Sequence, residues 1–210
     1  DQADVVFERG RYSVTGTNHS VAINEVARAA YIPHNFPLET LEPGLQDIAV
    51  YDPKAFAFSN GVHICEVEID PETGKTWLTR YVAVDDIGTV INPMIATGQV
   101  HGGVAQGFGQ AVLEHVAYDS DSAQALTGSF MDYAVPRASD LPFFVSEFDQ
   151  SQPCTHNPLG AKGCGEAGTI AAPAAITGAV LDALSSRGVI EIDMPITPFR
   201  VWKAIQGHRN

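Results

Sequence analysis

The chain has 210 residues, and its content of 45% hydrophobic and 18% charged residues is enough for a sizeable folded core. Its 25 acidic and 12 basic residues give a formal net charge of −13, which argues against nucleic acid or an anionic membrane surface as a partner, because both would repel it. The cysteines, Cys65, Cys154 and Cys164, include no C-x-x-C pair, so the sequence favours a reducing, cytoplasmic location. We find no apolar run long enough to predict a transmembrane segment.

The first part of the chain predicts a small hairpin followed by a helix. Apolar residues alternate at 5–7 and 12–14, which indicates two paired strands. Ser20 then precedes residues 21–31, whose apolar positions fit one face of a helix. Prolines interrupt residues 32–44, so we expect an extended connection there and a boundary between sub-domains.

The clearest strand pattern is a hairpin in the middle of the chain. Residues 62–69 and 78–84 alternate between apolar and polar side chains, and a turn sequence at 70–74 joins them. Asn92 and Pro93 have the chemistry of a helix N-cap and of the first helical position. The long helix that they begin is expected to continue without a break to about Val116.

The remaining sequence predicts loops, one strand and two helices. We expect loops at residues 117–142, an apolar strand at 143–148, a helix that Pro173 opens and Gly188 ends, and a last helix at 198–207. The predicted fold class is therefore α+β, with a mixed sheet built from hairpins, a long glycine-rich helix and shorter helices.

The predicted long helix contains several glycines, each of which should cost about 0.5–1 kcal/mol relative to alanine. They are Gly98, Gly102, Gly103, Gly107 and Gly109. Gln99, Gln106 and Gln110 share one face of the same helix. A row of amides beside glycine gaps could hydrogen-bond a polar cofactor. Alternatively, the glutamines only face water and the glycines permit close packing against another helix.

A lone carboxylate, Glu166, lies in the glycine-rich segment GAKGCGEAG, in what we expect to be a loop before the helix opened by Pro173. Enclosure would raise the pKa of this carboxylate, whereas Lys162 or a helix N-terminus would lower it. Glu166 is therefore a candidate general base, or simply a glutamate in a first helical turn. Cys164 could be a nucleophilic thiol, but no His or Asn partner is indicated.

Four segments follow one another in a distinctive order. They are VHICEVEIDPETGKTWLTRYVAVDDIGTVINPMIATGQVHGGVAQGFGQAVLEH, LTGSFMDYAVPRASDLP, NPLGAKGCGEAGTIAAPAAITGAVLDAL and PITPFRVWKAIQ. In these segments the chain resembles the C-terminal part of the molybdopterin-binding large subunit of the molybdenum hydroxylases, the superfamily of xanthine dehydrogenase and aldehyde oxidase. Within it, the sequence is most similar to aerobic carbon monoxide dehydrogenase large chains and their homologues.

The resemblance implies roles for particular residues. Glu166 matches the glutamate that acts as the catalytic base, and Gln99 matches a glutamine that hydrogen-bonds the pterin dinucleotide. No protein side chain ligates the metal in this family, so no metal ligand is expected here. The loop around the glutamate is expected to form the cofactor side of the site, through Lys162, Gly163, Cys164 and Gly165.

The resemblance also implies cofactors and partners. It implies a molybdenum-containing molybdopterin, carried as the cytosine dinucleotide, with copper only in a true carbon monoxide dehydrogenase. Iron–sulfur and flavin (FAD) subunits would carry the electrons away, and the complete enzyme would be a dimer of heterotrimers.

The resemblance implies that residues 1–210 are the C-terminal molybdopterin-binding portion of a larger subunit, because the large subunits of the family are far longer. The chain also opens directly into strand-like sequence and its first residue is not Met, which favours a piece of a longer polypeptide. Without the remaining half of that subunit the chain should be an inactive part of an oxidoreductase. An alternative is a non-catalytic binding or assembly module that keeps the fold, and the substrate stays open.

Overall fold

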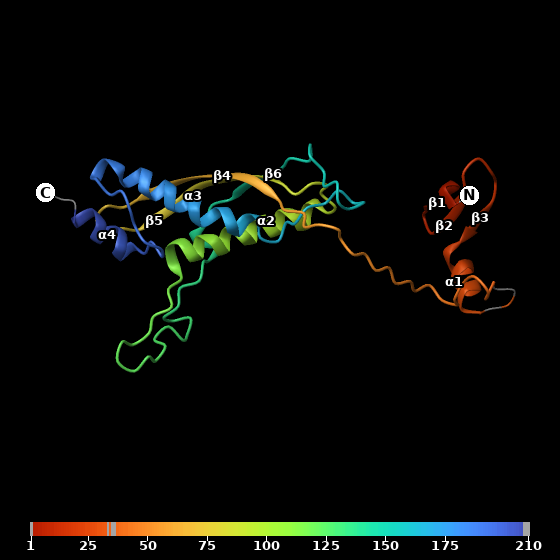
Figure 1. Ribbon diagram of the computed structural model, residues 1–210, viewed down its shortest axis with the longest axis horizontal. Coiled ribbons are helices and arrows are strands. Elements are labelled where there is room, and N and C mark those ends of the chain that lie inside the picture. The colour runs from red at the N-terminus through yellow and green to blue at the C-terminus, as the bar shows by residue number, and fades with distance from the viewer. Residues whose placement is uncertain (1, 33, 35–36, 208–210) are drawn as a thin grey trace. The chain divides into compact units, whose positions relative to one another are not determined.

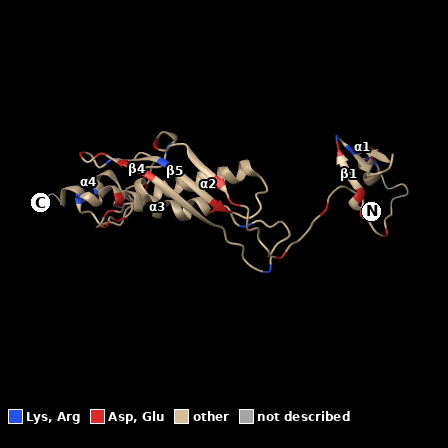
Figure 2. Cartoon of the chain, turned by 90° about the horizontal axis from the view of Figure 1, so that it is seen from above, with Lys and Arg blue, Asp and Glu red and all other residues tan. Residues whose placement is uncertain are grey.

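The structure is a computed structural model, and it describes residues 2–32, 34 and 37–207 (Figure 1). Its contacts divide the chain into two compact units, and the boundary in the sequence lies between Asp52 and Pro53. This division lies C-terminal to the expected connection at 32–44. Acidic residues are distributed over both units (Figure 2).

The N-terminal unit contains a short antiparallel sheet and one helix. After a 3₁₀ turn, η1 (Gln2–Asp4), the strands β1 (Val5–Glu8), β2 (Arg11–Val14) and β3 (Ser20–Ala22) pair in that order, and α1 (Ile23–Tyr31) follows. The hairpin predicted at 5–7 and 12–14 is confirmed. The helix begins later than expected, because residues 20–22 extend the sheet by pairing with β2. Ala30 is a buried hydrophobic residue of this unit.

The C-terminal unit is built on a mixed sheet in the order β4-β5-β6. Strands β4 (Asn60–Ile69) and β5 (Thr76–Asp86) form the predicted antiparallel hairpin, whose turn contains Gly74 at φ +74°. Strand β6 (Phe144–Phe148) lies parallel to β5, so the chain must cross over between them. The expected α+β class with a mixed sheet is confirmed.

The helices of this unit begin where side chains or packing fix their first turns. Helix α2 (Pro93–Phe108) has the predicted cap, since Asn92 Oδ1 accepts a hydrogen bond from the Ile95 nitrogen at 3.2 Å. A π-helical turn, η2 (Gly109–Leu113), continues it. The other elements are η3 (Ala138–Asp140), α3 (Ala167–Leu184), η4 (Ser185–Arg187) and α4 (Pro198–Gly207).

Helix α3 begins at Ala167, so the prediction that Pro173 opens it was wrong. The first turn is already closed by the hydrogen bond from the Ile170 nitrogen to the Glu166 oxygen at 3.0 Å. Pro173 lies inside the helix, where it removes one backbone hydrogen bond. Packing of the preceding turn against α2 stabilises the helix and offsets the loss of this hydrogen bond. The expected end of the helix at Gly188 is confirmed, because this residue has φ +79° and caps η4.

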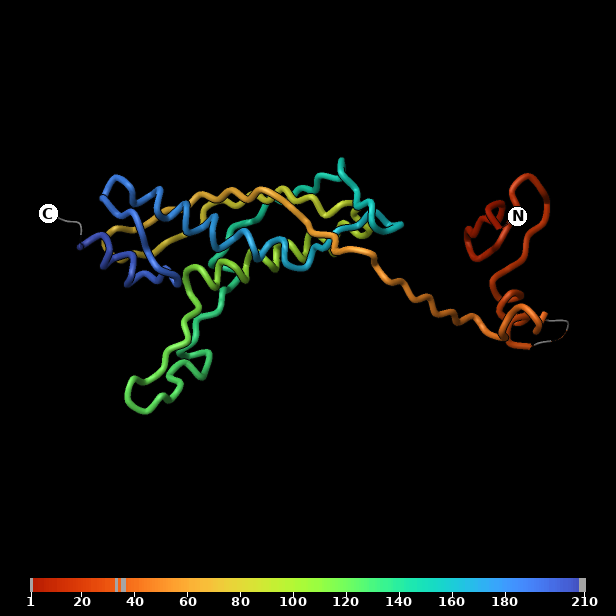
Figure 3. The backbone as a smooth tube through the Cα atoms, viewed as in Figure 1, coloured from red at the N-terminus to blue at the C-terminus, as the bar shows by residue number. Residues whose placement is uncertain are grey.

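The core of the C-terminal unit lies between the inner face of the sheet and the helices. It includes Tyr81 and Ala83 of β5, together with Val100, Val104 and Phe108 of α2, Ala172, Ile176 and Val180 of α3, and Val201 and Ile205 of α4. Helices α2 and α3 lie side by side along the sheet (Figure 3). The loop-rich segment expected at 117–142 leaves this body and returns, with an isolated bridge between Tyr118 and Ala125 (Figure 3).

The segment Ala167–Arg187 is long and apolar enough to cross a membrane by length and composition alone, with a mean hydropathy of 1.5. The sequence pattern had predicted no such segment. Core helices of soluble proteins meet the same criterion, so the finding is weak evidence for a membrane span. Here Ala172, Ile176, Val180 and Leu184 of α3 are buried in the core.

Candidate functional site

Helices α2 and α3 cross in direct backbone contact, and glycines make this contact possible. A methyl group added at Gly103 would lie 2.8 Å from the Thr169 nitrogen and 3.0 Å from the Gly168 Cα. One added at Gly168 would lie 2.9 Å from the Val104 nitrogen. Thr169 Oγ1 donates a hydrogen bond to the Gly103 carbonyl at 3.0 Å, which closes the contact. Close helix packing therefore accounts for these two glycines, as the second interpretation of the pattern expected.

Two other glycines of α2, Gly98 and Gly102, do not face the core. Gly98 and Gly102 are exposed, and a methyl group added at either would meet no atom within 4 Å. Gln99 and Gln106 are exposed on the same helix. Among the residues that the structure describes, the Gln99 amide has no hydrogen-bond partner. Packing within this chain therefore does not explain this surface of amides and bare backbone.

Glu166 is the N-cap residue of α3, and its side chain is exposed. Its carboxylate forms no capping hydrogen bond, so the fold does not use it to start the helix. Because Gly168 packs against the backbone of Val100 and Val104, the first turn of α3 lies beside the part of α2 that carries Gln99. The crossing thus brings the two predicted site segments together.

The loop before Glu166 is fixed by several contacts. Lys162 Nζ forms an ion pair with Asp86 Oδ2 at 2.5 Å, and the Lys162 nitrogen donates to the Ile87 carbonyl at 2.8 Å. The Gly163 nitrogen donates to the Ala57 carbonyl at 3.0 Å. Gly165 is exposed, and an added methyl group would meet no atom within 4 Å.

Cys164 lies partly buried beside α2, with its Sγ 3.9 Å from the Ala96 carbonyl oxygen. Burial, and secondarily the charge of Asp85, raise the pKa of this thiol above its usual range. A raised pKa is the opposite of what activates a nucleophilic cysteine. The structure therefore gives no support to a thiol enzyme based on Cys164.

A buried polar network, which the sequence pattern did not predict, lies on the inner face of the sheet. His63 Nε2 lies 3.1 Å from Asp85 Oδ1, and His63 Nδ1 lies 2.8 Å from the Tyr81 hydroxyl. Burial is the main cause that raises the pKa of Tyr81. His63 and Asp85 also line a cavity of about 130 Å³ that reaches Ala167 and Ile170 of α3. Alternation along β4 and β5 places all three side chains on the core side, and this was the available clue.

Comparison with known proteins then identifies the family. A family model described as the molybdopterin cofactor-binding domain matches residues 1–142, which is more than half of the chain. The chain belongs to the molybdopterin cofactor-binding domain family. Gln99 lies inside the matched residues, whereas Glu166 lies beyond them.

Relatives of this molybdopterin-binding chain extend the match over nearly its whole length. It is 36% identical over 208 residues to the carbon monoxide dehydrogenase large chain of Hydrogenophaga pseudoflava, covering 99% of this chain and 25% of that one. It is 40% identical over 207 residues to the nicotine 6-hydroxylase large subunit of Paenarthrobacter nicotinovorans, covering 98% and 25%. The chain therefore spans about a quarter of the length of these relatives.

Solved structures agree with these relatives. Quinoline 2-oxidoreductase from Pseudomonas putida 86 is 40% identical, with a TM-score of 0.81 over 98% of this chain and 26% of that one. A Cu,Mo-CO dehydrogenase in its carbon monoxide reduced state is 34% identical, with a TM-score of 0.80 over 99% and 26%. The resemblance to molybdenum hydroxylase large subunits is confirmed, and so is the expected type of fold.

The residues present fit the cofactor that the family implies. Gln99 offers an amide donor and acceptor beside Gly98 and Gly102, where no side chain stands in the way of a bulky polar group. Among the described residues, no group of three or more His, Cys, Asp or Glu side chains could hold a metal ion.

Proposed function

We propose that the chain is the C-terminal molybdopterin-binding portion of the large subunit of a molybdenum-dependent hydroxylase, and that residues 1–210 serve that subunit as one functional part. The observation that carries the proposal is the α2–α3 crossing, which places the Gln99 turn next to Glu166 while both side chains remain exposed. The names of the relatives, which include a carbon monoxide dehydrogenase and a nicotine 6-hydroxylase, support the class of reaction.

Each site residue has a distinct part in this proposal. The amide of Gln99 hydrogen-bonds the pterin, and the bare backbone at Gly98 and Gly102 lets the cofactor approach α2 closely. When bound, the molybdenum–pterin group supplies two-electron oxidation of a small substrate with an oxygen atom that comes from water. Glu166 acts as the general base that takes the proton from that water. The loop formed by Lys162, Gly163, Cys164 and Gly165 holds Glu166 at the cofactor side of the site.

The proposal extends to the complete enzyme. We expect the cofactor as the cytosine dinucleotide, and copper only if the remaining part of the large subunit supplies a ligand for it. Iron–sulfur and flavin subunits would accept the electrons, in a cytoplasmic dimer of heterotrimers. The similarity to large subunits of multi-subunit enzymes supports these partners.

The base is tested by Glu166→Gln in the complete large subunit, coexpressed with its partner subunits. We expect near-normal molybdenum content and a loss of turnover of about 10³-fold, because the amide cannot accept a proton. Turnover is measured as dye-linked oxidation over carbon monoxide, aldehydes and N-heterocycles. Asp182→Asn is the matched control, because Asp182 lies exposed near the other end of α3. Wild-type turnover in Glu166→Gln would refute the base.

The cofactor contact is tested by Gln99→Ala in the same preparation. We expect less pterin and molybdenum per subunit, with turnover per bound molybdenum changed less than cofactor retention. Gln124→Ala, at an exposed position of the protruding loop, serves as the control. A variant that retains all its cofactor but turns over slowly would place Gln99 in another role.

One observation favours the alternative of a non-catalytic assembly module. Gly103, Gly107 and Gly168 are explained by helix packing alone, without any ligand. Under this alternative the coexpressed complex would assemble stably without molybdenum and would show no oxidation activity. Recovery of molybdenum together with activity that depends on Glu166 would decide in favour of the enzyme.

A further inference from the structure

We propose that Asp86, at the end of β5, is a positioning residue for Glu166 and acts through its ion pair with Lys162. The proposal rests on the proposed function, because Glu166 is taken to be the base. It adds a residue outside the glycine loop and gives Lys162 the task of holding this loop rather than binding the cofactor.

The ion pair is largely removed from solvent. The side chains of Lys162 and Asp86 are 14% and 12% exposed. Asp86 also accepts hydrogen bonds from the Gly88 nitrogen at 2.8 Å and from Asn60 Nδ2 at 3.3 Å. The Lys162 hydrogen bond is the largest cause that lowers the pKa of Asp86, and the Gly88 hydrogen bond adds to it. The Asp86 carboxylate is therefore held at the end of β5 by several hydrogen-bond donors.

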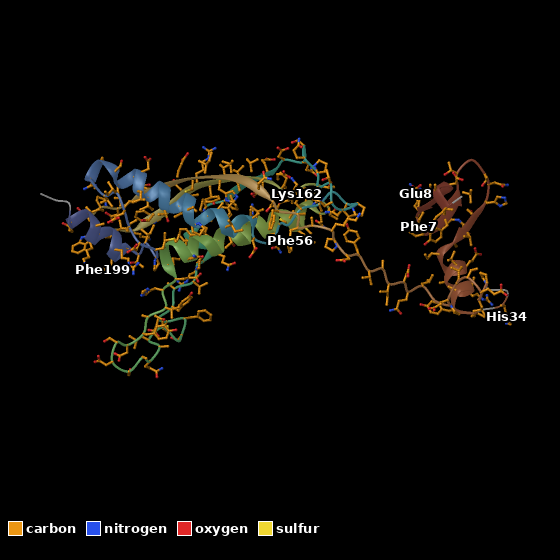
Figure 4. All side chains as sticks on the ribbon, in the orientation of Figure 1. Phe7, Glu8, His34, Phe56, Lys162 and Phe199 are labelled. Atoms are coloured by element: carbon orange, nitrogen blue, oxygen red, sulfur yellow. The ribbon has the colours of Figure 1, made fainter. Side chains whose placement is uncertain are left out.

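The backbone around Lys162 is hydrogen-bonded to the residues that come directly after β5. The Lys162 nitrogen donates to the Ile87 carbonyl, and the Thr89 nitrogen donates to the Gly160 carbonyl at 2.9 Å. Gly88 has φ +64°, and a methyl group there would lie 3.2 Å from the Lys162 nitrogen. The side chain of Lys162 thus binds the last residue of β5, and its backbone binds the turn that follows. Figure 4 labels Lys162 and Phe56, whose neighbour Ala57 accepts the Gly163 hydrogen bond.

Glu166 stands between two fixed points of the chain. On one side the ion pair fixes Lys162, and on the other Gly168 is packed against α2. A lysine whose ammonium group is buried against a carboxylate would have to break that pair to reach a cofactor phosphate. The charge of Lys162 is therefore used to pair with Asp86. Loss of this ion pair should make the loop mobile and displace Glu166.

The mechanical part of the proposal is tested without any catalytic assay. In the complete large subunit, Asp86→Asn and Lys162→Met should each speed amide hydrogen exchange at residues 160–166 by about tenfold or more. The double variant should exchange no faster than the single variants, because both remove one interaction. Glu66→Gln is the matched control, since its ion pair with Arg80 also involves a residue of β5 but is exposed, at 3.9 Å, and does not reach the glycine loop. Wild-type exchange in Asp86→Asn would overturn the proposal.

The functional part separates a holding role from a cofactor contact. We expect Asp86→Asn and Lys162→Met to keep their molybdenum and to lose turnover per molybdenum to a similar, non-additive extent. Loss of cofactor in Lys162→Met but not in Asp86→Asn would overturn the proposal by making Lys162 a cofactor ligand. If one variant aggregates, the other decides by the same measurements. Full activity of Glu166→Gln would refute the base but would leave the hydrogen-exchange result standing, so the two failures are distinguishable.

Discussion

The crossing of α2 and α3 makes a prediction in which neighbouring glycines respond with opposite sign. Gly103→Ala places a methyl group 2.8 Å from the Thr169 nitrogen and 3.0 Å from the Gly168 Cα. These are backbone atoms, so the helices must separate, and overpacking of this kind costs about 1–3 kcal/mol. The gain of about 0.5–1 kcal/mol from replacing a helical glycine offsets only part of that cost. At the midpoints of these two ranges, the expected net loss is about 1 kcal/mol.

Gly102→Ala is the control, because a methyl group there meets no atom within 4 Å. It should stabilise the same helix by about 0.5–1 kcal/mol in cofactor-free protein. Hydrogen exchange of α2 amides in the large subunit measures both local changes, and about 1.4 kcal/mol corresponds to a tenfold change in rate. If Gly103→Ala protects α2 as well as Gly102→Ala does, the backbone contact between the helices is refuted.

Three further predictions concern other parts of the C-terminal unit. Burial, and secondarily the charge of Asp85, raise the pKa of the Cys164 thiol. Its alkylation, followed by mass spectrometry, should therefore be slower at neutral pH than that of a free cysteine, and should accelerate only at a pH well above the ordinary pKa of a cysteine thiol. His63→Ala leaves the carboxyl group of Asp85, which is 3% exposed, without its side-chain partner, and should lower stability to denaturant by about 1–3 kcal/mol; an unchanged midpoint would contradict the network. Gly74→Ala should also destabilise, because Gly74 has φ +74° and a methyl group would strike the Pro198 carbonyl; heat denaturation at the wild-type temperature would argue against this contact.

The sequence predicted those helices and strands whose ends are determined by neighbouring residues in the chain. Asn92 and Pro93 marked the start of α2, and the alternation around residues 70–74 marked the central hairpin. It failed at α3, where proline chemistry suggested a start at Pro173 although the helix begins at Ala167. The start depends on a contact with α2, which no local pattern contains.

The candidate site shows the same division. The glycines of α2 form one pattern in the sequence, yet the structure separates Gly103, which packs against α3, from Gly98 and Gly102, which face open space. Lys162 was expected on the cofactor side, but its ion pair with Asp86 can be seen only once β5 and the glycine loop are folded together.

By itself, the sequence determined the family resemblance, the α+β class and the two residues, Gln99 and Glu166, on which the proposed chemistry depends. These follow from the order of residue types along the chain. Only the tertiary structure decided that Gln99 and Glu166 lie on neighbouring turns, and that His63 and Asp85 are buried together. The physical reason is that such contacts join residues far apart in sequence, and their geometry is set by the close approach of two glycine-bearing helices over one sheet.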